Sequence, residues 1–331
     1  MIYILERCFL ISLFISYFFI SPTYSQDSLH QRIDSSHYQQ ITAAGHTLYP
    51  YNKKRIRLVT AANIVGYGGT TVGFNAAWYA KYPRSSFHFF NDDAEWLQVD
   101  KAGHLYGAYI ESSVSYEMWR WSGLSRKQRI WIGGLSGLAY QSIIEVLDGF
   151  SSEYGFSTGD YAANILGSGL FIAQELAWDN QRIKLKFSFH KKDYGAADLD
   201  ARANAIYGKS ETERFLKDYN AATDWMSINV KSFFPKIKLP RWFSVALGYG
   251  AEGMFGARSN IAKDKNGNVI FDRSDIKRYR QWFLAPDIDL TKIKTKKRAV
   301  KIILGILNSF KFPTPSLEFS NGSFKGHWIH F

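Results

Sequence analysis

The sequence predicts an α+β protein in which a bundle of about four helices precedes a strand-rich, antiparallel half. Residues 53–180 hold long apolar segments with helical spacing and many small residues. After Trp178 the segments are short and aromatic, they alternate apolar with polar positions, and turn residues separate them. Residues 181–331 are therefore expected to form an antiparallel, membrane-associated region, either an open sheet or a barrel-like one.

The N-terminus predicts export. Residues 1–25 hold a short polar start and the apolar run FLISLFISYFFI, which is typical of a secretory signal peptide. An uncleaved signal anchor is the alternative, because Glu6 and Arg7 both precede the apolar run. The single cysteine, Cys8, also precedes it, so cleavage after Ser25 leaves no cysteine. Export without disulfides indicates a bacterial cell envelope, in the outer membrane or at its periplasmic face.

Charge restricts the partners. The chain of 331 residues has a net charge of +12, which suits an anionic partner. Because an exported protein does not meet nucleic acid, we expect membrane lipid or an anionic envelope surface as the partner. Other envelope proteins stay open as partners, and no oligomeric state is indicated.

Start and stop signals delimit the four helices that follow a polar leader at 26–52. Small residues recur in all four, and three of them carry Gly-x-x-x-Gly steps, which allow close backbone approach. No segment reaches the roughly 20 uninterrupted apolar residues of a spanning helix, so partial insertion or interfacial packing is favoured. The helices are expected from Lys53 to Pro83, over about 92–118 with Asn91 or Asp92 as N-cap, from Ser125 to Gly149, and from Ser157 through Trp178, with the glycine steps at Gly69 and Gly73, Gly103 and Gly107, and Gly133 and Gly137.

About six strands and two further helices are expected after Trp178. The chain closes on Phe331, and an aromatic last residue is typical of outer-membrane strands, although six strands are fewer than the eight of the smallest single-chain barrel. A soluble strand that ends on Phe is the alternative. The strands are expected within 182–189, 224–234, 242–256, 278–293, 315–320 and 326–331, and the helices at 211–222 and 296–310, the second of which has the composition of a membrane-surface helix.

Polar residues interrupt the apolar faces of two helices. Asp100, Lys101 and His104 share one side of the second helix, and Glu145 and Asp148 are three residues apart near the end of the third. Charged groups are rarely buried without partners, so these residues must pair, reach solvent or bind something. The simplest role for Lys101 is to neutralise Asp100 or Glu145. For Asp148, the structural alternative is that it shapes the turn before Gly149 and has no further role.

The fourth helix adds a polar stripe of its own. Asp160, Asn164 and Gly167 lie on one face, and Ser157 precedes Asp160 by three residues, which is the spacing of a capping box. A structural polar network of Ser157, Asp160 and Asn164 is one interpretation. If the three helices converge, their polar residues form a site.

Two chemistries are open for that site. In the catalytic interpretation His104 is a general base or nucleophile, Asp100 or Glu145 orients it, and Lys101 stabilises negative charge on the substrate. The sequence predicts no cofactor other than an optional divalent metal. The metal interpretation uses His104, Glu145, Asp148 and Asp160, a set that tolerates Zn, Mn or Mg.

The motifs D-K-x-x-H, E-x-x-D-G-F-S and G-F-S-x-G-D-x-x-A-N-x-x-G resemble the domain of unknown function 2279 family, the YfiM-like predicted periplasmic lipoproteins, over about 90–178. A remoter similarity is to the VanZ-like membrane family, from which the chain departs at Asp148, where that pattern favours Gln. The chain also has no lipoprotein cysteine. The resemblance implies a site at Asp100, Lys101, His104, Glu145, Asp160, Asn164 and Gly167.

We therefore expect a non-enzymatic, exported envelope protein with a buried polar network. The alternative is a membrane-proximal hydrolase or transferase that acts on a lipid or glycan. The sequence has no phosphate-binding glycine loop, nucleophile elbow, HExxH or CxxC motif, which favours the non-enzymatic interpretation.

Overall fold

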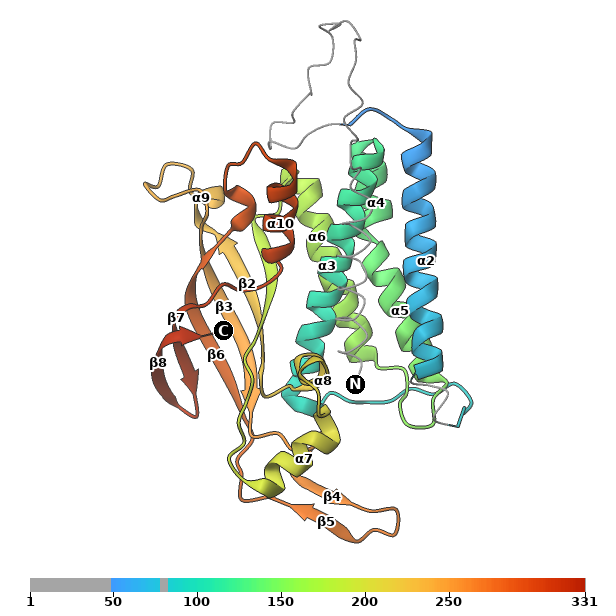
Figure 1. The fold of residues 1–331 in the computed structure, drawn as a ribbon, viewed down its shortest axis with the longest axis vertical. Coiled ribbons are helices and arrows are strands. Elements are labelled where there is room, and N and C mark those ends of the chain that lie inside the picture. The colour runs from blue at the N-terminus through green and yellow to red at the C-terminus, as the bar shows by residue number, and fades with distance from the viewer. Residues whose placement is uncertain (1–48, 78–82, 331) are drawn as a thin grey trace, which may run out of the picture.

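The computed structural model describes residues 49–77 and 83–330. Helices come first and an antiparallel sheet follows (Figure 1), which confirms the predicted α+β class. The predicted signal peptide at 1–25 and most of the predicted leader lie outside the described residues.

One helix holds the two halves of the molecule together. The bundle consists of α2 (Lys53–Ala77), α3 (Val99–Ser122), α4 (Arg126–Gly134), α5 (Ser136–Gly149) and α6 (Thr158–Trp178). Helix α3 contacts the other four helices and also the first three strands of the large sheet. Tyr106 and Tyr109 of α3 share a buried core with Leu185 and Phe187 of the first strand. The bundle and the sheet therefore share an apolar interface.

The predicted start of the second helix is wrong. A short 3-10 turn, η2 (Glu95–Gln98), precedes α3, and Gln98 rather than Asn91 or Asp92 is the N-cap. The φ angles of Trp96, Leu97 and Gln98 are 46°, 50° and 68°, which is left-handed backbone that costs such residues roughly 1–2 kcal/mol each.

Contacts from the C-terminal half hold this left-handed turn. The ring of Trp96 lies 4.7 Å from the ring of Tyr219, and its backbone N–H donates to the carbonyl of Ala257 at 2.7 Å. The hydroxyl of Tyr249 donates to the carbonyl of Leu97. Tertiary packing therefore overrides the local capping signals, and it fixes where the polar residues of α3 begin.

The third predicted helix is divided into α4 and α5 at Leu135. Ser125 caps α4 as expected, in a capping box with Gln128. Serines from two neighbouring helices satisfy the groups freed at the break: Ser112 of α3 donates to the carbonyl of Gly134 at 2.7 Å, and Ser168 of α6 accepts from the N–H of Leu138 at 2.9 Å. Gly133 and Gly134 directly precede the break and weaken the helix there, but Gly133 was interpreted only as part of the close-approach pattern.

The glycine steps differ in what they do. A Cβ atom built on Gly137 would lie 2.1 Å from the carbonyl oxygen of Ala108, and one on Gly133 would lie 2.5 Å from the Cα of Tyr116. Here α4 and α5 approach α3 closely, as the spacing predicted. Gly69 and Gly73 on α2 meet nothing within 4 Å, so that step makes no close contact in the part of the chain that the structure describes.

Substitution of Gly137 by alanine is expected to lower the free energy of unfolding by ~1–3 kcal/mol, because the added methyl group overlaps the backbone of α3. Chemical denaturation followed by circular dichroism measures this change. Gly69→Ala is the matched control, and it should be neutral or stabilising by up to ~1 kcal/mol, since, apart from its own helical turn, no atom of residues 49–77 or 83–330 lies within 4 Å of the added methyl group. Equal stability of the two variants would contradict the close approach.

The large sheet has six antiparallel strands in the order β1-β2-β3-β6-β7-β8 and is not a closed barrel, which corrects the barrel-like alternative. One edge strand is partly covered, because Phe187 of β1 forms an isolated bridge with Phe310. The strands are β1 (Ile183–Phe189), β2 (Ala222–Asn229), β3 (Phe243–Glu252), β6 (Tyr279–Ile288), β7 (Thr314–Ser320) and β8 (Ser323–His330).

Smaller elements connect these strands. The predicted helices are present as α8 (Glu211–Lys217) and α10 (Arg298–Leu307), and α9 (Val230–Phe233) and η3 (Leu290–Lys292) are short turns. Helix α7 (Ala197–Tyr207) and the hairpin of β4 (Ile261–Lys263) and β5 (Val269–Asp272) were not predicted from the sequence. Together, α7 and the hairpin lie at one end of the sheet (Figure 1).

Burial in the sheet is reversed relative to a soluble sheet. Polar side chains point to the buried face, among them Lys186, Ser227, Gln281, Asp287 and Glu318. They share this face with a small apolar cluster of Trp225, Ala246, Phe283 and Ala285. The strand register aligns exposed apolar side chains on the other face in two rows that cross adjacent strands. The first row is Met226, Leu247, Leu284 and Leu317, and the second is Trp282, Phe319 and Phe324, which begins beside the half-buried Tyr249.

The bundle shows the same reversal. All four charged residues of α5 and α6 are buried, namely Glu145, Asp148, Asp160 and Glu175. The exposed positions of these two helices are uncharged, and the large ones are Ile143, Val146, Ile165, Leu166 and Leu176. Within the described ranges one helical stretch, Arg126–Gly149, is long and apolar enough to cross a membrane by length and composition alone, a test that the core helix of a soluble protein also passes.

Candidate functional site

A cluster of ionisable side chains lies where the first turn of α3 meets the first turn of α6. The ammonium group of Lys101 is at its centre, 2.8 Å from Oδ1 of Asp92, 3.1 Å from Oδ1 of Asp160 and 3.5 Å from Oδ2 of Asp100. Three carboxylates thus share one ammonium group. The sequence suggested Lys101 as a neutralising partner for an acid, and the distances agree with that role.

Ser157 joins this cluster to α5. Its hydroxyl donates to Asp92 at 2.7 Å and accepts the N–H of Asp160 at 3.1 Å, which caps α6. The N–H of Ser157 donates to Oε2 of Glu145 at 3.2 Å. In a capping box this N–H would bind the N3 acid, Asp160. Because Glu145 accepts it instead, the carboxylate of Asp160 is left to face Lys101 and His104.

His104 lies between two carboxylates. Its Nδ1 is 3.1 Å from Oδ1 of Asn164 and 3.8 Å from Oε1 of Glu145, and its Nε2 is 3.7 Å from Oδ2 of Asp160. The side chains of His104, Glu145 and Asp160 are all 0% exposed. Gly167, one turn after Asn164, permits this arrangement, because a Cβ there would lie 2.3 Å from the carbonyl oxygen of Leu105.

The burial of so many acids displaces their pKa values. Burial, reinforced by the charge of Asp160, raises the pKa of Glu145 to about 10 and that of Asp100 to about 8. Burial lowers the pKa of His104. Burial opposes the charged form of Lys101 too, but the charges of Asp100 and Asp160 outweigh it and raise its pKa. At neutral pH the site therefore holds a charged lysine, a neutral histidine and protonated Asp100 and Glu145. Burial would raise the pKa of Asp92 too, but its hydrogen bonds with Asp160, Lys101 and Ser157 outweigh burial and lower it instead.

The structure brings together most of the residues that the sequence singled out. Asp100, Lys101, His104, Glu145, Asp160, Asn164 and Ser157 all belong to the cluster described above. Asp148 is buried, but it is outside the groups of acids and histidine whose ligand atoms lie within 4.8 Å of one another. Asp92 was missed as a site residue. It lies in the loop before α3, where no helical spacing links it to Lys101, and only the fold brings it there.

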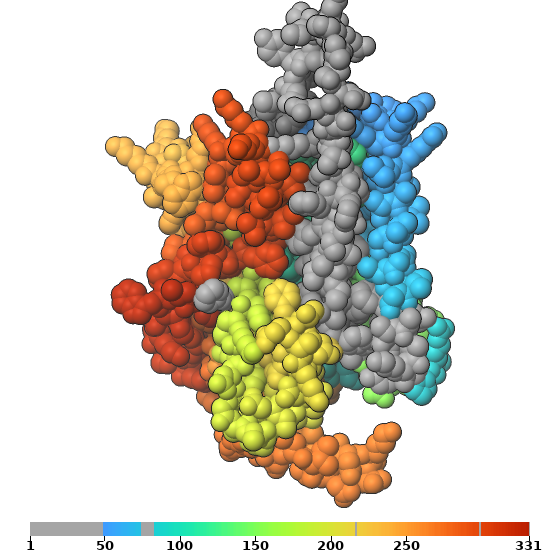
Figure 2. Space-filling model, viewed as in Figure 1, coloured from blue at the N-terminus to red at the C-terminus, as the bar shows by residue number. Residues whose placement is uncertain are grey.

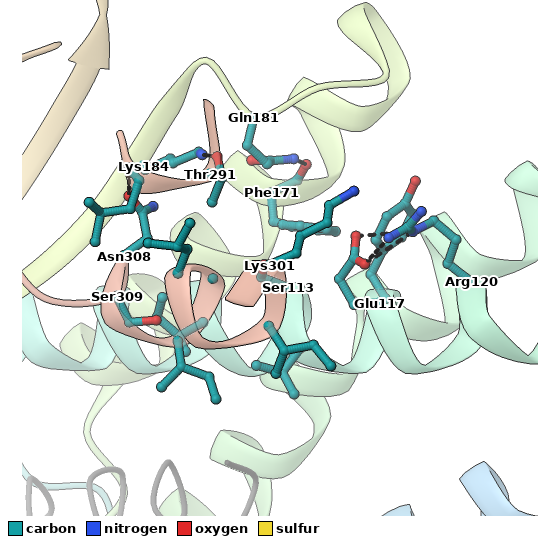
Figure 3. Close-up of a pocket in the computed structure, with 18 of the residues that line it drawn as sticks. Ser113, Glu117, Arg120, Phe171, Gln181, Lys184, Thr291, Lys301, Asn308 and Ser309 are labelled. Atoms are coloured by element: carbon teal, nitrogen blue, oxygen red, sulfur yellow. Dashed lines mark hydrogen bonds and ion pairs between the residues drawn. The ribbon is translucent and has the colours of Figure 1, made fainter. Parts of the chain in front are cut away.

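A separate cavity of about 370 Å³ lies between α3, α6, η3 and α10. Figure 3 shows the paired Arg120 and Glu117 at one end, Lys184 with Thr291 at the other, and Lys301 extending over the cavity. Its walls include apolar side chains of α3 and α10. None of the clustered residues around His104 lines it, so the buried cluster does not open into this cavity.

Comparison with known proteins identifies a matching family model. Residues 88–174 match a family model described as predicted periplasmic lipoprotein (DUF2279). The match agrees with the resemblance read from the motifs, covers the cluster from Asp92 to Asn164, and supports an exported cell-envelope protein. No curated protein and no solved structure matches the chain. The remoter similarity to the VanZ-like family is not shown.

Proposed function

We propose that the protein is a non-enzymatic envelope protein whose apolar exterior lies against lipid at the periplasmic face of the outer membrane. The observation that carries the proposal is the reversed burial of both halves. A soluble antiparallel sheet normally buries its apolar face and exposes its polar face. Lipid-facing strands show the opposite alternation.

The rows on the sheet supply a continuous apolar surface. Leu247, Leu284 and Leu317 are 45%, 47% and 44% exposed and come from three adjacent strands. Trp282 and Phe324 in the second row are 54% and 71% exposed. Contiguous apolar patches on this scale are uncommon on soluble monomers and mark interaction sites. Tryptophan also favours the boundary between lipid and water.

Helix α10 adds the attraction expected for anionic headgroups. Lys294, Lys296 and Lys297 precede or begin this helix and are exposed, and so are its apolar residues Ile303 and Leu307. Figure 2 shows α10, in orange-red, on the surface of the molecule. A short helix with basic and apolar exposed side chains suits the surface of an anionic membrane, which also agrees with the net charge of +12.

The role we assign to the buried cluster is to hold α3, α5 and α6 in register. A hydrolase or transferase needs its substrate to reach the reacting atoms, whereas the His104 side chain is fully buried. The large cavity is lined by other residues. These two observations weigh against the alternative of an enzyme acting on a lipid or glycan.

Vesicle flotation of the purified full chain tests the proposal. Leu284→Glu with Leu317→Glu places two charges in one apolar row, and it is expected to weaken binding to phosphatidylethanolamine and phosphatidylglycerol vesicles by roughly 100-fold. The wild-type chain should also fractionate with outer-membrane material.

The matched control adds the same two charges elsewhere. Val269→Glu with Ile270→Glu lies on β5, where these side chains are 55% and 64% exposed but outside the two rows. The control should float like wild type. If both double variants remain folded by circular dichroism and float equally, or if the wild type stays in the soluble periplasm, the proposal is wrong.

A further inference from the structure

We propose that His104, Glu145 and Asp160 bind one divalent transition-metal ion, with Zn²⁺ as the preferred ion, in the closed space between α3, α5 and α6. Each of the three residues offers one ligand atom, and these atoms all lie within 4.8 Å of one another. The inference concerns the inside of the bundle and does not depend on membrane binding.

The orientation of the histidine is the first argument. With Oδ1 of Asn164 as acceptor at 3.1 Å, Nδ1 carries the proton and Nε2 carries the lone pair. That lone pair faces Oδ2 of Asp160 at 3.7 Å. Two electron-rich atoms face each other stably only with a proton or a cation between them. Metal-bound histidines typically donate their other N–H to an oxygen, which is the role that Asn164 has here.

The second argument is the state of the carboxylates. Oε1 of Glu145 and Oδ2 of Asp160 are buried and have no hydrogen-bond partner within the described ranges. Both atoms belong to side chains that are 0% exposed. Oδ2 of Asp160 lies 3.7 Å from Nε2 of His104, whereas Oε1 of Glu145 lies 3.8 Å from Nδ1, so the Glu145 side chain would turn toward Nε2 to share the ion. A buried polar atom without a partner costs roughly 1–3 kcal/mol, and more when it is charged. A metal ion would satisfy both oxygens at once.

The neighbouring acids provide a comparison within the same molecule. Asp92, Asp100 and Asp160 form a second group with ligand atoms within 4.8 Å, and there the ammonium group of Lys101 supplies the cation. Asp160 belongs to both groups. Its Oδ1 contacts Lys101 and its Oδ2 faces His104, so one carboxylate would link a fixed lysine cation to a bound metal ion.

The chemistry of the donors selects the class of ion. Two carboxylates neutralise a divalent cation, so the loaded triad has no net charge in a buried space. One imidazole with two carboxylates favours Zn²⁺ or Mn²⁺ over Ca²⁺, which takes six to eight oxygen ligands. Ligand atoms around a tetrahedral Zn²⁺ lie roughly 3.3 Å apart, so small side-chain rotations would complete the site.

Metal content and thermal stability test the proposal directly. The purified full chain is stripped with a chelator, incubated with ZnCl₂ and desalted, and its metal is measured by mass spectrometry. We expect one equivalent of zinc per chain and a higher Tm with Zn²⁺ than with chelator. Glu145→Gln and Asp160→Asn should each weaken zinc binding by roughly 100-fold. Glu111→Gln alters another buried acid of the bundle, outside the triad, and should bind zinc like wild type.

A measurement on the wild type keeps the test decisive if the triad variants fail to fold. X-ray absorption of the zinc-loaded chain should show only nitrogen and oxygen ligands, including one imidazole. Zinc below about one-tenth of an equivalent, no change in Tm with Zn²⁺ or Mn²⁺, or unchanged binding by folded Glu145→Gln would overturn the proposal. Stronger binding of Mn²⁺ than of Zn²⁺ would support the site and correct the choice of ion.

Discussion

Replacement of Lys101 by methionine is expected to lower the free energy of unfolding by ~3–5 kcal/mol, or to prevent folding. Its ammonium group lies within 3.5 Å of Asp92, Asp100 and Asp160, all of which are buried. Methionine keeps the length of the side chain but removes the charge, so three mutually repelling acids lose their common cation. Urea denaturation at pH 8, followed by circular dichroism, measures the loss.

The loss should depend on pH in a defined direction. The pKa of Asp100 is raised from 3.8 to about 8 by burial and by Asp160, so its contribution to stability is fully present below pH 3.8 and is lost as the pH rises toward 8. At pH 5 Asp100 keeps its proton in the folded chain, so its interaction with the ammonium group of Lys101 contributes less to stability. Lys101→Met should therefore cost more stability at pH 8 than at pH 5.

Lys191→Met is the control for removing a lysine. Lys191 pairs with Glu211, but their side chains are 68% and 69% exposed, so its loss should change the free energy of unfolding by less than ~1 kcal/mol. A similar cost for the two variants, or a cost of Lys101→Met that does not vary with pH, would show that the shared ammonium group does not stabilise the cluster.

The parts of the fold that depend on local signals were predictable. Ser125 and Ser157 cap their helices as the sequence predicted, and Gly137 makes the close approach that its spacing indicated. His104 and Glu145 were also recognised as site candidates from local patterns, since each interrupts an apolar helix face, whereas their convergence stayed conditional on how the helices pack. Each of these predicted features is indicated by residues within a single segment of the chain.

The features that were missed depend on distant partners. The left-handed residues before α3 are held by Tyr219, Tyr249 and Ala257, more than 100 positions away in the chain. The break at Leu135 depends on serines of two other helices. The pattern within one segment carries no information about such distant partners. The start signals and helical spacing therefore predicted one continuous helix over 125–149.

Average hydropathy also concealed the reversed burial. The mean hydropathy is −0.23, a value that argues against a membrane protein when every residue counts equally. In the folded chain the polar side chains of α5, α6 and the large sheet are largely buried, and apolar side chains occupy the exterior. The composition therefore records how many polar groups there are, whereas the strand register decides which surface they occupy.

The buried face of the sheet gives the second large expected effect. Asp287 accepts from Lys186 at 2.7 Å and from the hydroxyl of Ser227 at 2.6 Å, and Lys311 lies 3.8 Å away. The side chains of Lys186 and Asp287 are 0% exposed. Asp287→Asn is expected to cost ~3–5 kcal/mol of stability, because two buried ammonium groups lose the carboxylate between them.

A second substitution separates this electrostatic cause from a simple loss of packing. Lys186→Met in the Asp287→Asn background removes one of the stranded charges, so the double variant should be more stable than Asp287→Asn alone, although it carries more changes. Urea denaturation of the wild type, both single variants and the double variant completes the cycle. If the losses of unfolding free energy of the two single variants add up to that of the double variant, Lys186 and Asp287 are not an interacting pair. The charges on the buried face of the sheet would then not stabilise it. If the double variant recovers stability, the buried face is held by paired charges, which explains how the sheet can place its apolar side chains outward.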